Sequence, residues 1–555
     1  MTLFRHGVLV VAFVAAMIGL AARVIYLGVN EREFLSQQGE ARSVRTETIA
    51  AHRGAILDRH GEILALSTPV QSAWTDPSRH QFTSTELRAV ARALNLSVAE
   101  LEEKLSPVDS SGSGRGREFA YLKRRLSDAE AKAAQKLDID GLFFRTEYRR
   151  FYPAAEVAAH VVGKTSIDDL GLEGIELAFN TQLNGEPGRR RVLKDRRGRL
   201  IDVLDFGEQA RFGDDLALAL DLRLQYLAYR ELKAAVQDQR AASAALVMVD
   251  VETGEVLAMV NQPSYNPNEP LRPGYAGQRN IAVTDTFEPG STVKPFTALA
   301  ALESNAYRPD TVIDTSPGYF RVGTKLIQDP VDRGSITLAG ALAKSSQVAI
   351  AKIALELAPE AVLDVLTRAG MARFVGTGLP GEASGRFSGA DLSKPINRAV
   401  LSYGYGLSAS PLQIAQSYLT LATGGIHRPI SVLKRTQAPP DQRVFDARTV
   451  RSVVDMLEGV TAPDGTAPQA ALPRYRVAGK TGTARKLRGG AYVDEQHVAL
   501  FAGMVPASDP KLVLVVVIDE PGTLRTSGGA SAAPVFARVA DQALKLLGAP
   551  GDARG

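Results

Sequence analysis

The hydrophobic pattern of the chain begins with one long apolar segment, "GVLVVAFVAAMIGLAARVIYLGV", which covers residues 7–29 and is broken only by Arg23. About 20 apolar residues span a bilayer, and an arginine near the end of a span can extend to the interface. The pattern predicts an uncleaved single-pass anchor. Arg5 precedes the segment, which predicts that residues 1–6 form a short cytoplasmic tail. A cleaved signal peptide is the alternative, but the run is longer than the usual apolar region of such peptides.

After the anchor, short strand-like runs alternate with helical ones. Residues 52–67, "HRGAILDRHGEILALS", have β-like runs separated by glycines, which predicts a hairpin. Residues 84–140 carry leucines at helical spacing, with Ser84 or Thr85 as the expected helix cap. These features predict an elongated mixed α/β pedestal domain over residues 30–215.

The pattern changes near residue 216. A strand leads into a long amphipathic helix, and "AALVMVDVETGEVLAMV" predicts two strands joined at Glu252-Thr253-Gly254. Helices follow from 291 to about 425, then three strands and a closing helix over about 532–547. The sequence therefore predicts an α+β fold in which helices flank an antiparallel sheet over residues 216–550, with 551–555 as a tail.

Composition narrows the chemistry. A chain of 555 residues is too long for one ordinary core, and its net charge of +4 is too small to indicate a nucleic-acid partner. There is no cysteine, which excludes disulfides, thiolate nucleophiles and cysteine-bound zinc, and the seven histidines form no zinc-hydrolase motif. We expect no metal and no cofactor, so catalysis must come from serine, lysine, tyrosine or carboxylates.

The stretch "FEPGSTVKPFTALAAL", residues 287–302, places Ser291 three residues before Lys294 where a helix should start. Residues three apart share a helical face, and a lysine in an apolar setting can serve as the base that a serine nucleophile needs. The motif alone is weak evidence, because Ser291 could simply cap the helix. The same motif also occurs at residues 431–434, in a predicted strand, and at residues 508–511, in a predicted turn. Residues three apart on a strand face opposite sides, so we interpret both copies as chance matches.

Two further motifs follow in order. Ser345, Ser346 and Gln347 precede another helix, and "KTGT" places Lys480, Thr481, Gly482 and Thr483 on a predicted strand. Such a trio of motifs is the set used by penicillin-binding proteins and class A β-lactamases for serine acyl transfer. Two Gly-Lys-Thr triplets do not make a nucleotide site, because the glycine that a phosphate-binding loop needs five residues earlier is missing from both.

With these motifs the chain resembles the class B penicillin-binding proteins, the monofunctional peptidoglycan D,D-transpeptidases, particularly the division-specific septal type. The resemblance covers nearly the whole chain. It includes "RGAILDRHGEILA", "YRRFYPAAEVAAHVVG" and "GLEGIELAFN" in the pedestal, and "PSYNPN", "SYGYGLSASPLQIAQSY", "KTGTARK" and "GGASAAPVF" in the catalytic part. It implies a serine β-lactamase-like transpeptidase domain on the periplasmic side of the inner membrane.

The resemblance also implies roles for the motif residues. Ser291 would attack the penultimate D-Ala carbonyl of a stem peptide ending in D-Ala-D-Ala, Lys294 would be the general base, and Ser345 would shuttle a proton. Lys480 would hold the electrostatic network, and the backbone N–H groups of Ser291 and Thr483 would form the oxyanion hole.

The remaining implied contacts are with ligands and partners. Gln347, Thr481, Gly482 and Thr483 would bind the substrate or a β-lactam, through the hydroxyls of the two threonines and the close approach that glycine permits. Other implied partners are a membrane-embedded glycan polymerase and divisome proteins.

One residue departs from the family pattern, because Gln347 stands where asparagine is usual. The additional methylene moves the amide by about a bond length, which matters where a displacement of about 1 Å can cost about 100-fold in rate. Either the pocket is reshaped, or the protein is a specialised paralogue. A β-lactamase, a β-lactam sensor and a poorly catalytic divisome scaffold stay as alternative functions.

Overall fold

The structure is a computed structural model that describes residues 2–31, 44–106, 119–194, 200–270, 274–388, 391–488, 491–522 and 526–553. Within that part of the chain one helix is long and apolar enough to cross a membrane, over His6–Val29 of α1 (Thr2–Val29). The helix starts before the predicted residue 7 because nothing in the first residues breaks a helix. It fits the predicted single-pass anchor.

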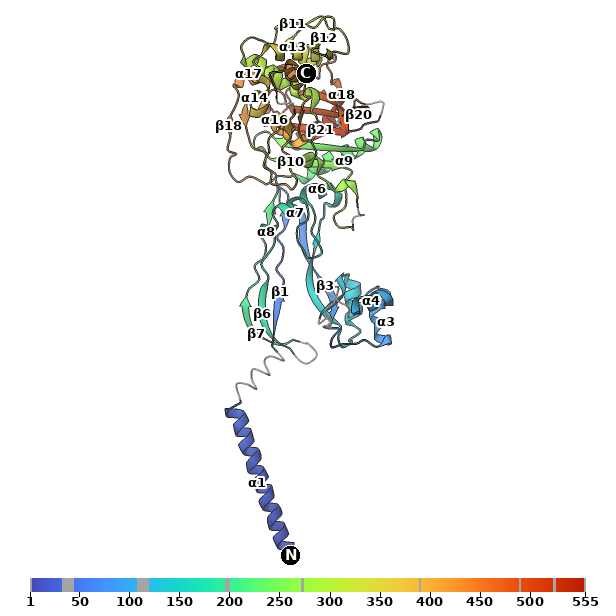
Figure 1. Ribbon diagram of the computed structural model, residues 1–555, viewed down its shortest axis with the longest axis vertical. Helices are drawn as coiled ribbons and strands as arrows, with labels where there is room; N and C mark the ends of the chain where they lie inside the picture. Colours follow the sequence, from blue (N-terminus) through green and yellow to red (C-terminus); the bar gives the residue numbers. More distant parts are fainter. Residues whose placement is uncertain are drawn as a thin grey trace. The chain divides into compact units, whose positions relative to one another are not determined.

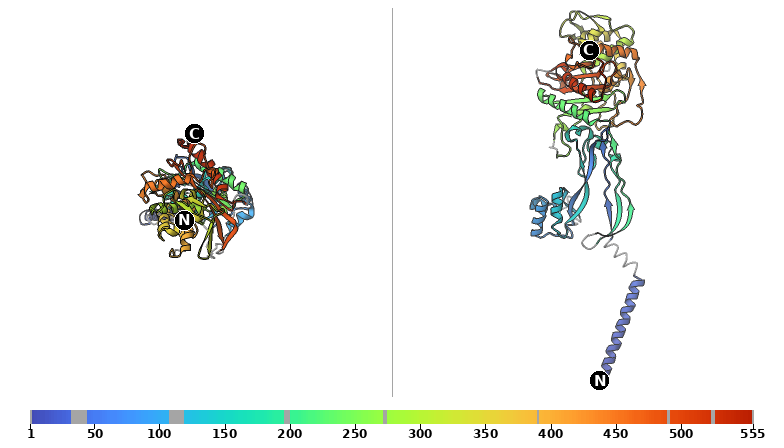
Figure 2. Two further views of the ribbon diagram at one scale, coloured as in Figure 1. Left: turned by 90° about the horizontal axis from the view of Figure 1, so that it is seen from above. Right: turned by 180° about the vertical axis from the view of Figure 1, so that it is seen from behind.

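The chain divides into two compact units, whose segments alternate along the sequence, and α1 belongs to the first. The first contains residues 1–53, 68–149 and 184–213, and the second contains 54–67, 150–183 and 214–555. In the first unit β1 (Val44–Ile49), β6 (Gly188–Lys194) and β7 (Leu200–Glu208) lie side by side in an antiparallel sheet (Figure 1 and Figure 2).

A small helical core completes the first unit. The helices α3 (Ser84–Ala93), α4 (Val98–Leu105) and α5 (Asp128–Gln135) each begin with a capping box. They surround β4 (Ala120–Leu126), which pairs with β3 (Ile63–Thr75), and bury Leu94, Leu101 and Leu122.

Two predictions for this region are wrong. The helical pattern expected over 84–140 is interrupted by β4, whose alternating buried positions Ala120 and Leu122 face the core of the unit. The cap of the first helix is Thr83, not Ser84 or Thr85, because Thr83 stands three residues before Glu86 and exchanges hydrogen bonds with it.

The second unit is built on a five-stranded antiparallel sheet in the order β10-β9-β21-β20-β19. The strands are β9 (Ser243–Asp250), β10 (Val256–Gln262), β19 (Ala478–Arg488), β20 (Ala491–Val505) and β21 (Leu512–Asp519). Seven consecutive positions of β21 are buried, so both faces of the sheet are covered.

Helices provide that cover (Figure 1). α9 (Leu222–Gln239) and α19 (Ala533–Leu546) pack against each other and against strands β10 and β21 respectively, while α16 (Pro411–Ala422) packs on β9, β20 and β21. The predicted α+β architecture, with helices flanking an antiparallel sheet, is confirmed.

Further helices connect these layers. They are α6 (Ala159–Val162), α7 (Gly174–Ala178), α8 (Asn180–Leu183), α10 (Ile281–Thr284), α11 (Lys294–Glu303), α12 (Leu338–Ala343), α13 (Gln347–Glu356), α14 (Ala361–Arg368), α15 (Pro395–Ser402), α17 (Ala447–Glu458) and α18 (Gly528–Ser531). The 3-10 helices are η1 (Ala155–Val157), η2 (Ala276–Gln278), η3 (Gly290–Val293) and η4 (Pro468–Ala470).

One further long strand, β5 (Phe143–Phe151), pairs with β3, and the strands that remain are short. They are β2 (Ile56–Leu57), β8 (Leu216–Ala217), β11 (Val312–Asp314), β12 (Tyr319–Val322), β13 (Lys325–Gln328), β14 (Ser335–Thr337), β15 (Arg386–Phe387), β16 (Leu407–Ser408), β17 (Ile426–His427) and β18 (Gln442–Arg443). β2 and β3 pair antiparallel, which confirms the predicted hairpin near residues 52–67.

Polar residues of the pedestal motifs stabilise the second unit. Asp58 is buried and accepts hydrogen bonds from the backbone N–H groups of His60, Glu62 and Leu222, so it joins the hairpin to the start of α9. Arg150 and Glu176 form a fully buried ion pair with 2.7 Å between Nε and Oε1. Buried charges of this kind are tolerated only when paired.

Candidate active site

The turn before Ser291 is shaped by two glycines. Gly290 and Gly404 both have positive φ, +54° and +89°, and the N–H of Gly290 donates to the carbonyl of Gly404 at 3.1 Å. A Cβ added to Gly404 would lie 1.9 Å from the carbonyl oxygen of Gly290, so only glycine fits there. The "SYGYG" segment therefore holds the turn from which Ser291 projects.

Ser291 lies in the 3-10 helix η3, directly before α11, rather than in the α-helix itself. In a 3-10 helix, with three residues per turn, side chains at i and i+3 lie one above the other, which puts Ser291 and Lys294 on one side. Ser291 is half-buried, and its hydroxyl makes no hydrogen bond to any residue that the structure describes. The hydroxyl is open to an incoming ligand.

Lys294 is completely buried, and its amine points at Ser345. Nζ donates to the Ser345 carbonyl at 2.5 Å and to the Ser345 hydroxyl at 3.1 Å. Burial lowers the pKa of Lys294 to about 7, an effect that Asp329 opposes and Arg333 reinforces through their charges. About half of the Lys294 amine is then neutral at pH 7, the form that can accept a proton.

Lys480 approaches the same hydroxyl from β19. Its Nζ lies 3.0 Å from Ser345 Oγ and also contacts the carbonyl and hydroxyl of Thr481, at 3.2 and 3.3 Å. Burial, helped by the nearby charge of Lys294, lowers the pKa of Lys480 well below its usual range. The Ser345 hydroxyl thus lies between two buried amines from different elements.

Asp329, which follows β13, fixes the segment that carries Ser345. Its carboxylate is buried and accepts from Ser346 Oγ at 2.5 Å and from the N–H groups of Gln347 and Val348 at 2.6 and 3.4 Å. Because the first backbone N–H groups of a helix have no partner within it, the N-terminus of α13 favours the negative charge of Asp329. Ser345 itself is held with φ +57°, an unusual conformation for a residue with a side chain.

Sequence reasoning missed Asp329, since it lies 18 residues before Gln347 and no spacing connects the two. Gln347 is the first residue of α13. Its backbone is fixed by Asp329, while its half-buried side-chain amide makes no hydrogen bond within the described ranges. The amide remains available for a ligand.

The "KTGT" residues lie on β19, the edge strand of the sheet. The Thr481 hydroxyl pairs with that of Thr466 at 3.1 Å, and the Thr483 hydroxyl accepts from the N–H of Gly528 at 3.1 Å. A Cβ on Gly482 would lie 2.5 Å from the Leu500 side chain. Packing against Leu500 therefore favours glycine at position 482 even without a ligand. The sequence indicated only the close approach of a ligand as the reason for this glycine.

The other two Ser-x-x-Lys motifs do not bring serine and lysine together. Ser431 donates to the carbonyl of Leu433, while the Lys434 amine donates to the carbonyl of Arg59. Ser508 donates to a carboxylate at 2.6 Å, and Lys511 forms an ion pair of its own.

Comparison with known proteins agrees with this geometry. The family description "Penicillin binding protein transpeptidase domain" matches residues 244–541, and "Penicillin-binding Protein dimerisation domain" matches residues 48–218. The chain is 40% identical to the peptidoglycan D,D-transpeptidase FtsI of Escherichia coli K12, over 99% of this chain and 93% of the relative. The chain belongs to the penicillin-binding protein family.

Other relatives place this penicillin-binding protein in class B. It is 37% identical to a probable peptidoglycan D,D-transpeptidase, PbpC of Pseudomonas aeruginosa, over 99% of this chain and 96% of the relative. Among solved structures, penicillin-binding protein 3 of Mycobacterium tuberculosis in complex with aztreonam matches with a TM-score of 0.71 and 26% identity, over 91% of this chain and 98% of that one.

The transpeptidase domain of penicillin-binding protein 3 from Burkholderia pseudomallei is 38% identical, with a TM-score of 0.56, over 61% of this chain and 98% of that one. The predicted family and the predicted enzyme class, peptidoglycan D,D-transpeptidase, are confirmed.

Proposed function

We propose that this penicillin-binding protein crosslinks peptidoglycan stem peptides at the division septum by serine acyl transfer through Ser291. The observation that carries the proposal is the shared contact of the Lys294 and Lys480 amines with one hydroxyl, that of Ser345. Lys294 stands three residues after Ser291 and shares its side of the helix start. A buried lysine with a pKa of about 7 can remove the proton of a serine at neutral pH.

The first step of the reaction would acylate Ser291. Ser291 Oγ attacks the carbonyl carbon of the penultimate D-Ala while its proton passes to Lys294 Nζ. The backbone N–H groups of Ser291 and Thr483 stabilise the oxyanion of the tetrahedral intermediate. The C–N bond then breaks, and the proton held by Lys294 passes through Ser345 to the leaving D-Ala amine, while Lys480 holds the electrostatic network.

The second step reverses these transfers. The amine of a neighbouring stem peptide attacks the acyl-Ser291 ester, gives up its proton through the same groups, and returns the hydroxyl of Ser291. A β-lactam would acylate Ser291 in the same way. We propose that Gln347, Thr481, Gly482 and Thr483 bind the substrate or the drug along β19, because an edge strand can pair with an extended peptide.

The proposal extends to topology and partners. Residues 1–6 would lie in the cytoplasm and the chain after the anchor in the periplasm, since Arg5 precedes the anchor. We propose a pedestal over 30–215 and a catalytic domain over 216–550. The family resemblance implies that the pedestal has no glycosyltransferase module, so we propose that a membrane-embedded glycan polymerase and other divisome proteins act with this chain.

Labelling with a fluorescent penicillin tests the proposal. The full-length protein should become covalently labelled and should crosslink stem peptides, and Ser291→Ala should lose both activities. Ser508→Ala is the matched control, because that serine belongs to a chance motif, and it should be labelled like the native protein. Rapid turnover of the bound drug would instead support a β-lactamase. Normal septation in cells that carry only Ser291→Ala would support the scaffold alternative.

A further inference from the structure

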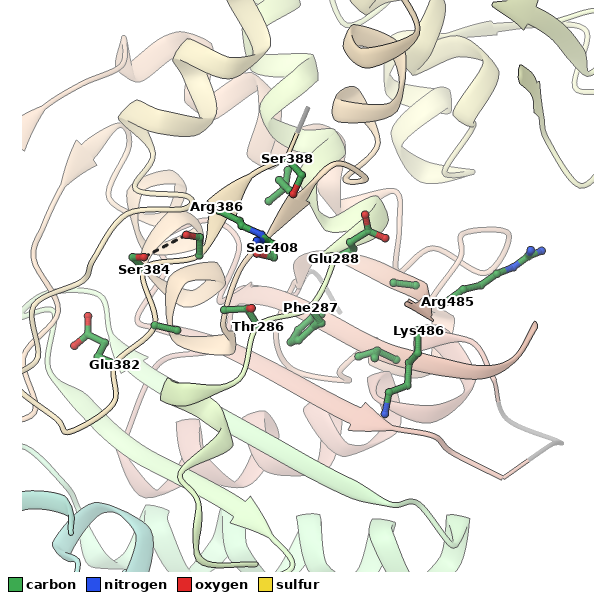
Figure 3. A pocket seen from close by; sticks show the side chains of 15 residues that line it. Thr286, Phe287, Glu288, Glu382, Ser384, Arg386, Ser388, Ser408, Arg485 and Lys486 are labelled. Carbon is green, nitrogen blue, oxygen red and sulfur yellow. Dashed lines mark hydrogen bonds between the residues drawn. The ribbon is translucent and has the colours of Figure 1, made fainter. Parts of the chain in front are cut away.

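A cavity of about 700 Å³ adjoins the candidate active site (Figure 3). Phe287 and Glu288, on its wall, come shortly before Ser291, and Ala484, Arg485 and Lys486 directly follow Thr483 on β19. A strand rises about 3.3 Å per residue, so these β19 residues extend the edge by roughly 10 Å beyond Thr483. A peptide lying along β19 with its scissile bond at Ser291 could reach the cavity.

The opposite wall consists of β15, β16 and the loop before them. Arg386 projects from β15, where it pairs with Ser408. In Figure 3 its side chain runs toward the centre of the lining residues, whereas the side chain of Arg485 extends away from them. Within the ranges that the structure describes, Arg386 makes no hydrogen bond or ion pair, and its side chain is exposed.

Three other charged groups around the cavity, Glu288, Glu382 and Lys486, are engaged. Glu382 accepts from the N–H groups of Val375, Gly376 and Thr377. Lys486 forms ion pairs of 2.9 and 2.7 Å with two carboxylates of the β21 end.

Glu288 likewise accepts hydrogen bonds, from the N–H of Gly406 and from the hydroxyl of Tyr492. Arg485 also belongs to the lining, but its side chain extends away from the other lining residues (Figure 3), so Arg386 is the charged side chain that runs inward and makes no hydrogen bond or ion pair of its own within the described ranges.

We propose that Arg386 forms a carboxylate-binding subsite, which recognises an acidic side chain of the stem peptide upstream of the terminal D-Ala-D-Ala. The proposal rests on the proposed transpeptidase function. A guanidinium matches a carboxylate through two parallel N–H···O bonds. The cavity volume lies in the range of small-molecule sites, and the serine and threonine hydroxyls of Thr286, Ser388 and Ser408 provide further donors. The subsite selects a stem peptide that carries a side-chain carboxylate upstream of D-Ala-D-Ala.

The test uses two matched ligand pairs on the full-length protein. One pair is a stem pentapeptide with a carboxylate-bearing diamino acid and the same peptide with lysine. The other is a penicillin with an additional side-chain carboxylate and its uncharged parent. The acidic member of each pair should acylate Ser291 of the native protein about 10- to 100-fold faster than the neutral member. That ratio corresponds to the contribution of one charge-assisted hydrogen bond. High salt should reduce that preference.

Arg386→Gln should remove the preference while leaving acylation by the neutral ligands unchanged, and Arg386→Lys should restore part of it. Arg321→Gln is the matched control, since Arg321 is an exposed arginine of β12 that does not line the cavity.

Equal rates with acidic and neutral ligands in the native protein would overturn the subsite, even if Arg386→Gln did not fold. An Arg386→Gln variant whose acylation rate falls equally with the acidic and the neutral ligand would also overturn the subsite. Either result leaves the transpeptidase proposal standing as long as Ser291 is labelled, whereas no acylation by any ligand would overturn the proposed function.

Discussion

The lowered pKa of Lys294 predicts a pH profile for acylation of Ser291. Lys294 must be neutral to accept the serine proton, and burial places its pKa at about 7. The neutral fraction is then about 1% at pH 5, about 10% at pH 6 and about 90% at pH 8. We expect the acylation rate to increase about 90-fold from pH 5 to pH 8, and then to level off.

The assay is stopped-flow or quenched labelling with a fluorescent penicillin at subsaturating concentration, between pH 5 and pH 9. A circular dichroism spectrum at each pH confirms that the protein stays folded. A rate that keeps increasing tenfold per pH unit through pH 9 would mean an ordinary lysine pKa, near 10.5. That result, or a flat profile, would refute Lys294 as the neutral base.

A second variant checks the cause of the shift. The positive charge of Arg333 helps to lower the pKa of Lys294. Arg333→Gln should therefore move the midpoint of the profile to higher pH without altering the plateau rate. Arg308→Gln, which removes an exposed arginine after α11, is the control and should leave the midpoint unchanged. A midpoint that moves to lower pH in Arg333→Gln would contradict the electrostatic explanation.

Two further predictions concern the stability of the second unit and the unusual second motif. Glu176→Gln removes the negative charge that lies 2.7 Å from the buried guanidinium of Arg150, so we expect a loss of about 3–5 kcal/mol of unfolding free energy in denaturant titrations. A loss below about 1 kcal/mol would contradict a strong contribution from this buried pair. Gln347→Asn shortens the side chain by one methylene and displaces its amide, in a pocket that we expect to be shaped around glutamine. Acylation by penicillin should therefore slow by about tenfold, within the range that a displacement of about 1 Å can produce. Faster acylation in this variant would instead indicate a specialised paralogue with a compromised site.

The sequence predicted the local features of the site because each depends on neighbouring residues. The break at Glu288-Pro289-Gly290 predicted a helix start near Ser291, and the alternating "KTGT" region predicted a strand. The main sheet was predicted in the same way, from apolar runs joined by a hairpin. The family resemblance, not spacing, connected the three motifs.

The parts that sequence reasoning missed depend on contacts between distant residues. Asp329 is indistinguishable from a surface aspartate until folding places it at the N-terminus of α13. Strand β4 has leucines at a spacing that also suits a helix, and only its pairing with β3 decides the outcome. The role of Gly404 likewise depends on its close approach to Gly290, more than 100 residues earlier.

The buried amine of Lys294 couples folding to proton release. In the unfolded chain this lysine has its ordinary pKa of 10.5, whereas in the folded protein the pKa is about 7. Between these values the unfolded state binds one more proton, so the free energy of unfolding increases with pH by up to 1.36 kcal/mol per unit and reaches about 5 kcal/mol in total. Below pH 7 that stabilisation is absent, and the rest of the core must hold a charged amine out of water. The group that we propose as the base for Ser291 therefore also makes the domain less stable at neutral pH than at alkaline pH, over the range between its two pKa values.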